Sequence, residues 1–184
     1  MRIALVTQAY YPVRGGVTEH VWHLGRELEH RGHQVTVITG QAKPREDRDL
    51  RVIRLGRQIP MTVNGANISI TWGWKLGRAL QQIEAREKFD LVHIQCPIDP
   101  GLPLIAAKSM RTVKVGTHHT FRPRNPLAEL FPGVLGDAMK KVAAHIAVSP
   151  SAEWLVKKYF PATEVTVIPN GVDVDRFNRR SFQP

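Results

Sequence analysis

Short apolar, β-branched runs alternate with segments of helical periodicity along most of the chain. Residues 2–7 form the first apolar run, apolar side chains then recur at helical spacing from Val17 to Leu28, and residues 34–39 (QVTVIT) are typical of a strand. Gly32 suits the left-handed position that follows a helix C-terminus. A strand–helix–strand unit of this kind predicts a right-handed crossover and a parallel sheet, with ligand sites outside the carboxyl ends of the strands.

The same alternation continues to the end of the chain. It predicts strands at 51–55, 90–95, 114–118, 144–149 and 165–168, and helices at about 74–86, 102–110, 127–142 and 150–159. Because the strands are almost continuously apolar, we expect an α/β fold, a Rossmann-like, doubly wound parallel sheet covered on both faces. A length of 184 residues fits one domain, which we place at 1–169, and the polar segment 170–184 is predicted to be a linker.

Composition is that of a folded globular protein. Hydrophobic residues make up 42% and charged residues 23%, close to the averages for such chains. The single cysteine, Cys96, cannot form an internal disulfide and has no second cysteine at a zinc-like spacing, so we expect a cytoplasmic protein without a metal site. The N-terminal apolar run is too short for a signal peptide and is interpreted as a buried strand.

The chain is strongly basic, with a formal net charge of +10 and a pI near 10.3. Residues 105–145 carry seven Lys or Arg against two acidic residues. Within that stretch an apolar stripe over 126–143 is flanked by four basic side chains, Arg122, Arg124, Lys140 and Lys141. Such a segment either lies on an anionic membrane or packs on its own sheet. Trp72 and Trp74 are likewise either core residues or part of an interfacial patch.

A glycine pair, Gly15-Gly16, stands immediately before the first predicted helix. Glycine lets backbone amides approach an anion, and a helix N-terminus offers unpaired N–H groups, so this loop can hold a diphosphate. The alternative is a tight turn that needs glycine. The spacing is not G-x-G-x-x-G, which disfavours a nicotinamide-dependent dehydrogenase.

Polar residues follow two of the predicted strands where ligands are expected. His118-His119-Thr120 ends one strand, and Gln95-Cys96-Pro97 follows another. A histidine there can bond sugar hydroxyls or phosphate, or be structural. His93, inside its strand, is expected to satisfy its hydrogen bonds within or beside the sheet. The chain has no Ser-His-Asp order and no close carboxylate pair at strand ends, which disfavours hydrolase chemistry.

Several motifs together resemble a known family. The opening MRIALVTQAYYPVRGGVTEHVWHLG, the strand DLVHIQCP, the turn THHT, the strand AHIAVS and the terminal VIPNGVDVDRF are similar to the N-terminal domain of family 4 (group 1) glycosyltransferases of the GT-B fold. Within that family PVRGGVTEHV, and VNG followed by Trp-Gly, most resemble bacterial phosphatidylinositol mannosyltransferases.

The resemblance implies a reaction and separate roles for two domains. It implies a retaining transfer of mannose or a related hexose from a nucleoside diphosphate sugar, GDP- or UDP-linked, to a hydroxyl acceptor such as phosphatidylinositol, with no cofactor required. The donor would bind mostly on a C-terminal domain that lies beyond the linker, so this hexosyltransferase domain alone is expected to be inactive. Catalysis would depend on positioning and on stabilisation of the leaving phosphate.

The resemblance also assigns roles to individual residues. Gly15 and Gly16 would contact the donor diphosphate, and His119, the catalytic candidate, would contact the transferred sugar. The acceptor-side candidates are Tyr10, Tyr11, Thr18, Asn64, Arg78 and Gln95. Gln95-Cys96-Pro97 departs from the His-Glu-Pro that many relatives carry, so no carboxylate contact is expected there.

A competing hypothesis is a non-catalytic module whose basic faces bind anionic lipid or another polyanion. No nucleic-acid-binding motif accompanies the charge, so nucleic acid is not an expected partner. Both hypotheses allow a cytoplasmic protein that contacts the inner face of the membrane peripherally.

Overall fold

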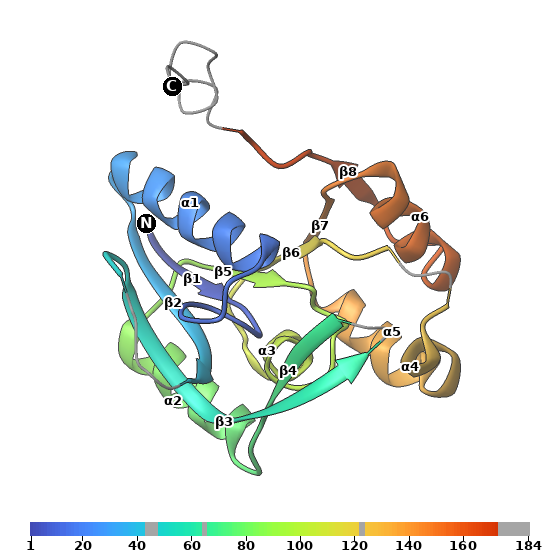
Figure 1. Cartoon of the computed structure of the whole chain (residues 1–184), viewed down its shortest axis with the longest axis horizontal. Coiled ribbons are helices and arrows are strands. Elements are labelled where there is room, and N and C mark those ends of the chain that lie inside the picture. Colours follow the sequence, from blue (N-terminus) through green and yellow to red (C-terminus); the bar gives the residue numbers. More distant parts are fainter. Residues whose placement is uncertain (43–47, 64–65, 122–123, 173–184) are drawn as a thin grey trace, which may run out of the picture.

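A computed structural model describes residues 1–42, 48–63, 66–121 and 124–172, of which 60–63 and 66–68 by backbone alone. Its centre is an eight-stranded sheet of order β4-β3-β2-β1-β5-β6-β7-β8 (Figure 1). The strands are β1 Arg2–Val6, β2 Gln34–Gln41, β3 Arg51–Val63, β4 Ala66–Trp72, β5 Leu91–Gln95, β6 Lys114–His118, β7 Ala144–Ala147 and β8 Val165–Val167. The helices are α1 Gly16–His30, α2 Leu76–Glu87, α3 Leu102–Ser109, α4 Pro126–Leu130, α5 Pro132–Lys140 and α6 Pro150–Tyr159. The expected Rossmann-like parallel sheet is present.

One strand pair departs from the expected pattern. The strand predicted at 51–55 is the start of the thirteen-residue β3, which pairs antiparallel with β4, from Arg57 opposite Trp72 to Val63 opposite Ala66. All other neighbouring strands are parallel. The β-branched residues around Asn64-Gly65 are the usual signal for such a hairpin, so this element could have been predicted.

The single helix predicted over 127–142 is two helices, α4 and α5, divided at Phe131. Pro132 has no N–H to continue the helix, whereas it fits the first turn of a new one. The side chain of Asn125 caps α4 by accepting from the amide of Ala128. Ser149 caps α6, with Oγ accepting from Ala152 N at 3.2 Å.

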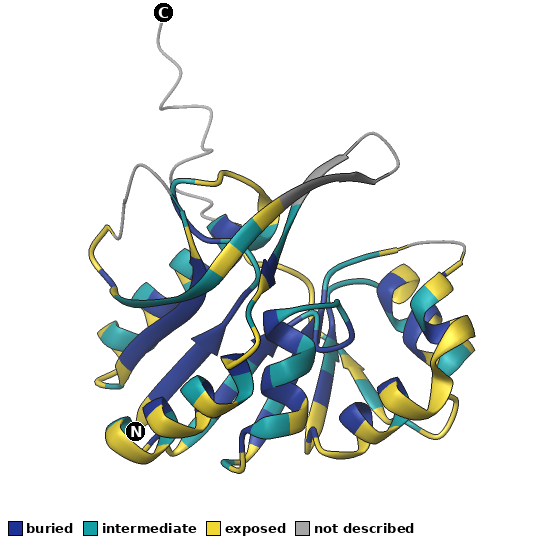
Figure 2. Ribbon diagram, turned by 90° about the horizontal axis from the view of Figure 1, so that it is seen from below, coloured by how far each residue is buried: buried dark blue, intermediate teal, exposed yellow. Residues whose placement is uncertain are grey.

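Alternating side chains along the strands build a core on each face of the sheet. In β1, Ile3 and Leu5 pack with α1, whereas Ala4 and Val6 belong to the cluster that α2, α3 and α5 complete. The central strands β1 and β2 are accordingly buried, while the helices turn exposed faces outward (Figure 2). Among the described residues no helix is long and apolar enough to cross a membrane.

Part of the sheet surface lies open on the α1 side. Val115, Ala144, Ile146 and Thr166 share this face according to the register of β6, β7 and β8. Ala144 and Thr166 are exposed, and Val115 and Ile146 are only half-buried. No part of the chain that the structure describes buries these four residues.

Candidate functional site

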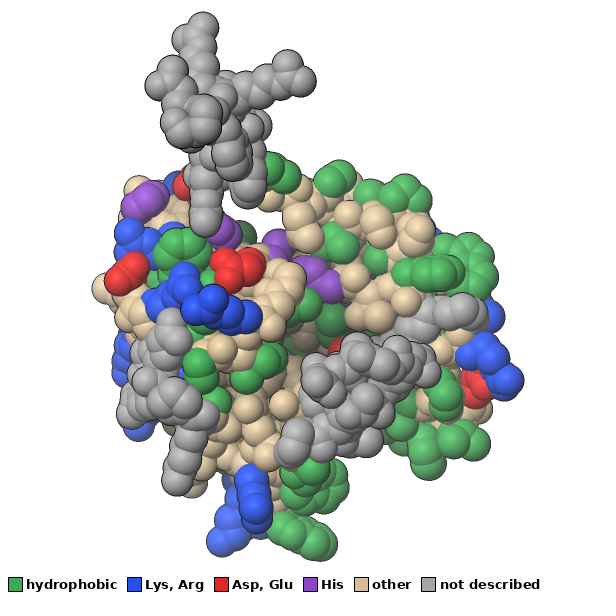
Figure 3. Space-filling model, in the orientation of Figure 1, with side chains coloured by type: hydrophobic (Ala, Val, Ile, Leu, Met, Phe, Trp, Pro, Cys, Tyr) green, Lys and Arg blue, Asp and Glu red, His purple; other side chains and the backbone are tan. Residues whose placement is uncertain are grey.

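The carboxyl ends of β1, β5 and β6, which are neighbours in the sheet, bring three loops to one edge. A hollow on this edge is lined by Cys96 and Asp99 after β5, by His119 and Thr120 after β6, and by Leu155 of α6. Figure 3 shows histidine side chains gathered beside a hollow on this face. This is the place where the parallel topology predicts a ligand.

His119 is held by two other segments of the chain. Its Nε2 lies 2.6 Å from Oε1 of Gln95, and its ring packs edge-to-face against His20 of α1, with ring centroids 4.7 Å apart. Burial, and then the neighbouring His20 and His93, lower the pKa of His119 to about 4. The imidazole is therefore neutral at physiological pH and acts as a hydrogen-bonding group.

His93 and His118 form separate, more deeply buried contacts. His93 Nε2 is 2.7 Å from Thr117 Oγ1, so the expected hydrogen bonding of His93 within the sheet is confirmed. His118 Nε2 lies 3.3 Å from His145 Nδ1. Burial is the main cause that lowers the pKa of His93 to about 4 and that of His118 to about 3, so both side chains are neutral.

The glycine pair lies where the sequence predicts, with Gly15 as the N-cap of the fifteen-residue α1. Both glycines are exposed, and a Cβ on either would meet nothing within 4 Å among the described residues. No side chain in the described part of the chain caps this helix. The first-turn amides of α1 therefore stay open to an anion.

Tyr10 and Tyr11 are core residues with no exposed surface. The Tyr11 hydroxyl donates to Oε1 of Glu19, and its ring lies under the guanidinium of Arg48, 3.5 Å from the ring centroid. Arg54 Nη2 donates to the Tyr11 carbonyl at 2.6 Å. The loop after β1 is thus fastened on several sides, and neither tyrosine presents surface to an acceptor in this structure.

The other acceptor-side candidates are dispersed. Thr18 is 2% exposed and its Oγ1 donates to the carbonyl of Val13, while Gln95 is 1% exposed. Arg78 is exposed on α2 and does not line the hollow. Asn64 lies outside the described residues. The structure thus brings Gln95 and His119 into contact, but it does not bring the acceptor-side candidates together in one site. Contacts between these residues and an acceptor stay predictions.

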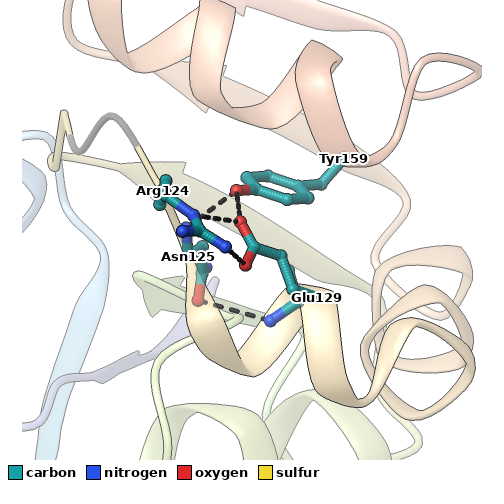
Figure 4. A network of polar contacts seen from close by, with 5 residues as sticks. Arg124, Asn125, Glu129 and Tyr159 are labelled. Atoms are coloured by element: carbon teal, nitrogen blue, oxygen red, sulfur yellow. Dashed lines mark hydrogen bonds and ion pairs between the residues drawn. The ribbon is translucent and has the colours of Figure 1, made fainter.

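Of the four basic side chains that flank the apolar stripe, Arg124 is paired with an acidic residue, Glu129. Arg124 Nε and Nη2 donate to the two carboxylate oxygens of Glu129 at 3.1 and 2.7 Å (Figure 4). Lys141 Nζ donates to the carbonyl of Lys108 at 3.2 Å, whereas Lys140 is exposed. Arg122 lies outside the described residues.

The apolar stripe beside these cations is divided between core and surface. Leu135 and Met139 are buried, but Leu130, Phe131 and Val134 are 72%, 53% and 43% exposed. The tryptophans in β4 and before α2 are not core residues either, with Trp72 53% and Trp74 94% exposed. Packing on the sheet therefore explains only the buried part of the apolar stripe. The exposed side chains remain available for contact with a membrane.

Two site features were not predicted from the sequence. His20 lies one turn into α1, a position that the location of the α1 N-terminus at this edge could have suggested. Cys96 adopts a left-handed backbone with φ of 53°, which sequence does not signal for cysteine. Within the described ranges no group of three or more His, Cys, Asp or Glu is arranged to hold a metal ion.

Comparison with known proteins identifies the family of the chain. Residues 14–176 match the family model Glycosyltransferase Family 4. A phosphatidyl-myo-inositol mannosyltransferase of Mycolicibacterium smegmatis is 32% identical over 96% of the chain and 45% of its own length. An alpha-monoglucosyldiacylglycerol synthase of Acholeplasma laidlawii is 29% identical over 99% of the chain and 49% of its own length. The chain thus spans about half the length of these curated relatives.

The fold has solved counterparts as well. A glycosyltransferase from Rickettsia africae superposes on the whole chain with a TM-score of 0.66 at 18% identity, over 46% of its own length. The match confirms the expected fold, a Rossmann-like α/β sheet of the GT-B type. With the family model covering most of the chain, the protein belongs to Glycosyltransferase Family 4.

Proposed function

We propose that this chain is the acceptor-side half of a retaining glycosyltransferase. It would transfer mannose or a related hexose from a GDP- or UDP-sugar to a lipid hydroxyl, with phosphatidylinositol as the first candidate acceptor. The observation that carries the proposal is the joint location of His119 and the open N-terminus of α1 at one edge of the sheet. Lipid acceptors are supported by the names of the two relatives, which refer to phosphatidyl-myo-inositol and to a monoglucosyldiacylglycerol.

The roles follow from the chemistry of these groups. Open amides at the α1 N-terminus favour an anion, which suits the diphosphate of a sugar nucleotide. A neutral imidazole favours hydrogen bonds with hydroxyls of the transferred sugar. Rate acceleration would then come from orientation of donor and acceptor and from stabilisation of the leaving phosphate, without a resident cofactor.

A second domain completes the proposed site. The relatives are about twice as long as this chain. The open sheet face that carries Ala144, Ile146 and Thr166 offers apolar surface for such a partner. We accordingly expect the isolated chain to fold and to show little transfer on its own.

The test is a His119→Ala variant of the enzyme that combines this chain with its donor-binding half. Loss of one transition-state hydrogen bond is expected to lower turnover at least about 10-fold. His30→Ala, exposed at the far end of α1, is the matched control and should retain the parent rate. Equal rates for both variants, or robust transfer by the isolated chain, would contradict the proposal.

The surface of α4 and α5 favours a membrane contact in addition. Leu130, Phe131 and Val134 are exposed on the same α4–α5 segment as the exposed Lys140, a combination that suits an anionic bilayer. We place the protein in the cytoplasm, in peripheral contact with the inner face of the membrane. Without catalysis, the same surface would make the chain an anionic-lipid binding module.

Flotation with anionic and neutral liposomes tests this surface. Phe131→Ser is expected to weaken flotation on both lipids, and a Lys140→Glu, Lys141→Glu double variant to weaken it on anionic liposomes only. Glu153→Gln, on the first turn of α6, serves as a control that leaves flotation unchanged. If both variants float like the parent chain, α4 and α5 do not contact the membrane.

A further inference from the structure

The contact between Gln95 and His119 joins two neighbouring strand ends. Gln95 pairs with Thr117 in the register of β5 and β6, so His119, two residues further on, lies close enough to the end of β5 for its ring to reach the Gln95 side chain. The Gln95 amide is almost completely buried, at 1% exposure, and its Oε1 lies 2.6 Å from Nε2 of His119. No bulk water competes for this hydrogen bond.

The contact determines where the imidazole proton resides. An amide oxygen only accepts, so His119 Nε2 must donate and carry the hydrogen. His119 is neutral, because burial and the neighbouring His20 and His93 lower its pKa to about 4. A neutral imidazole has a single N–H, and Nδ1 is therefore left with a lone pair.

We propose that Gln95 is a positioning residue that fixes the Nε2–H tautomer of His119 and leaves Nδ1 as an acceptor for a ligand hydroxyl. The identity of that hydroxyl, one of the transferred sugar, rests on the proposed function, whereas the tautomer does not. His119 then receives a hydrogen bond from the substrate and donates none to it. This role replaces direct acceptor binding by Gln95, whose side chain has almost no accessible surface.

The choice of an amide at position 95 supports this role. A carboxylate there would favour the charged imidazolium and remove the Nδ1 lone pair. An aliphatic side chain would not accept a hydrogen bond from His119 and would therefore not favour either of its tautomers. The amide also carries a cost, since Gln95 Nε2 is buried with no hydrogen-bond partner among the described residues. An aliphatic residue would avoid that cost but would also remove the oxygen that His119 Nε2 contacts.

The experiment is long-range ¹H–¹⁵N correlation NMR on the chain with ¹⁵N-labelled histidine, which reports the protonation of each ring nitrogen. The His119 signals are assigned with His119→Ala. Gln95→Leu removes the acceptor at similar size and is expected to convert His119 from the Nε2–H form to a mixture of tautomers. Thr117→Val, which removes the 2.7 Å contact of His93, is the matched control and should change His93 signals while leaving the tautomer of His119 unchanged.

Gln95→Glu provides a second measurement that does not depend on how Gln95→Leu folds. The carboxylate keeps the acceptor and adds a charge, so the pKa of His119 is expected to rise by about 1 to 3. An Nδ1–H tautomer in the parent chain, an unchanged tautomer in Gln95→Leu, or an unchanged pKa in Gln95→Glu would each overturn the positioning role. In the two-domain enzyme, Gln95→Leu should lower kcat about 10-fold. An unchanged rate in His119→Ala would instead contradict the proposed function, so the two failures are distinguishable.

Discussion

The backbone N–H of Asn125 donates to the hydroxyl of Tyr159 at 2.8 Å, which fastens the segment after β6 to the last turn of α6. The same hydroxyl donates to Glu129 Oε1 at 2.9 Å, and Glu129 also holds Arg124 (Figure 4). Asn125 lies between the candidate catalytic His119 and α4 in the chain, so the network anchors the start of α4.

Tyr159→Phe tests this anchor. The variant leaves the Asn125 amide without its partner while keeping the ring, and we expect a loss of about 1 kcal/mol in the free energy of unfolding. Hydrogen exchange at the Asn125 amide should accelerate. Glu129→Gln keeps an acceptor for the tyrosine and is the matched control, with exchange at Asn125 near the parent rate. Parent-like exchange in Tyr159→Phe would show that the contact does not hold the start of α4.

Acidification is expected to destabilise the fold before most carboxylates titrate. His93 and His119 have pKa values of about 4 and His118 of about 3 in the folded chain, below the ordinary value of 6.5. Below about pH 6.5 the unfolded state therefore binds more protons than the folded state. The contribution of these neutral histidines to the free energy of unfolding is fully present above about pH 6.5 and is lost as the pH drops toward 4. Each such histidine contributes up to about 1.4 kcal/mol per pH unit within that window.

Urea unfolding between pH 7 and pH 5 measures this dependence. In His93→Leu the slope of the free energy of unfolding against pH should be smaller than in the parent chain. His30→Leu, whose side chain is exposed, should keep the parent slope. Equal slopes in the parent and His93→Leu would contradict the assignment of His93 as a neutral buried group.

Two glycines are predicted to respond in opposite directions to alanine. Gly101 has a φ of +91°, and a Cβ there would lie 2.6 Å from the carbonyl oxygen of Thr71. Gly101→Ala should therefore lower the free energy of unfolding by roughly 1–3 kcal/mol. Gly136 lies in α5 with nothing within 4 Å of an added Cβ, so Gly136→Ala should raise it by about 0.5–1 kcal/mol. Thermal denaturation compares both, and destabilisation by Gly136→Ala would indicate a contact absent from the described residues.

The sequence by itself determined the order of most of the elements and the family. Strand and helix periodicities are local, so β1, α1 and β2 and the glycine pair before α1 could be predicted from neighbouring residues. The motifs around His119 and the segments DLVHIQCP and AHIAVS carried the family resemblance, which the family model confirms. The β3–β4 hairpin also has a local signal, which the expectation of a purely parallel sheet obscured.

Only the tertiary structure decided which side chains meet and which are exposed. Gln95 and His119 are joined because β5 and β6 are neighbours, and strand order depends on contacts between residues far apart in the chain. Tyr11, which is fully buried, has the guanidinium of Arg48 over its ring and accepts a hydrogen bond at its carbonyl from Arg54, two residues some forty positions away. Conversely, Trp74 is almost fully exposed although its type favours burial, since exposure depends on what the remaining elements cover.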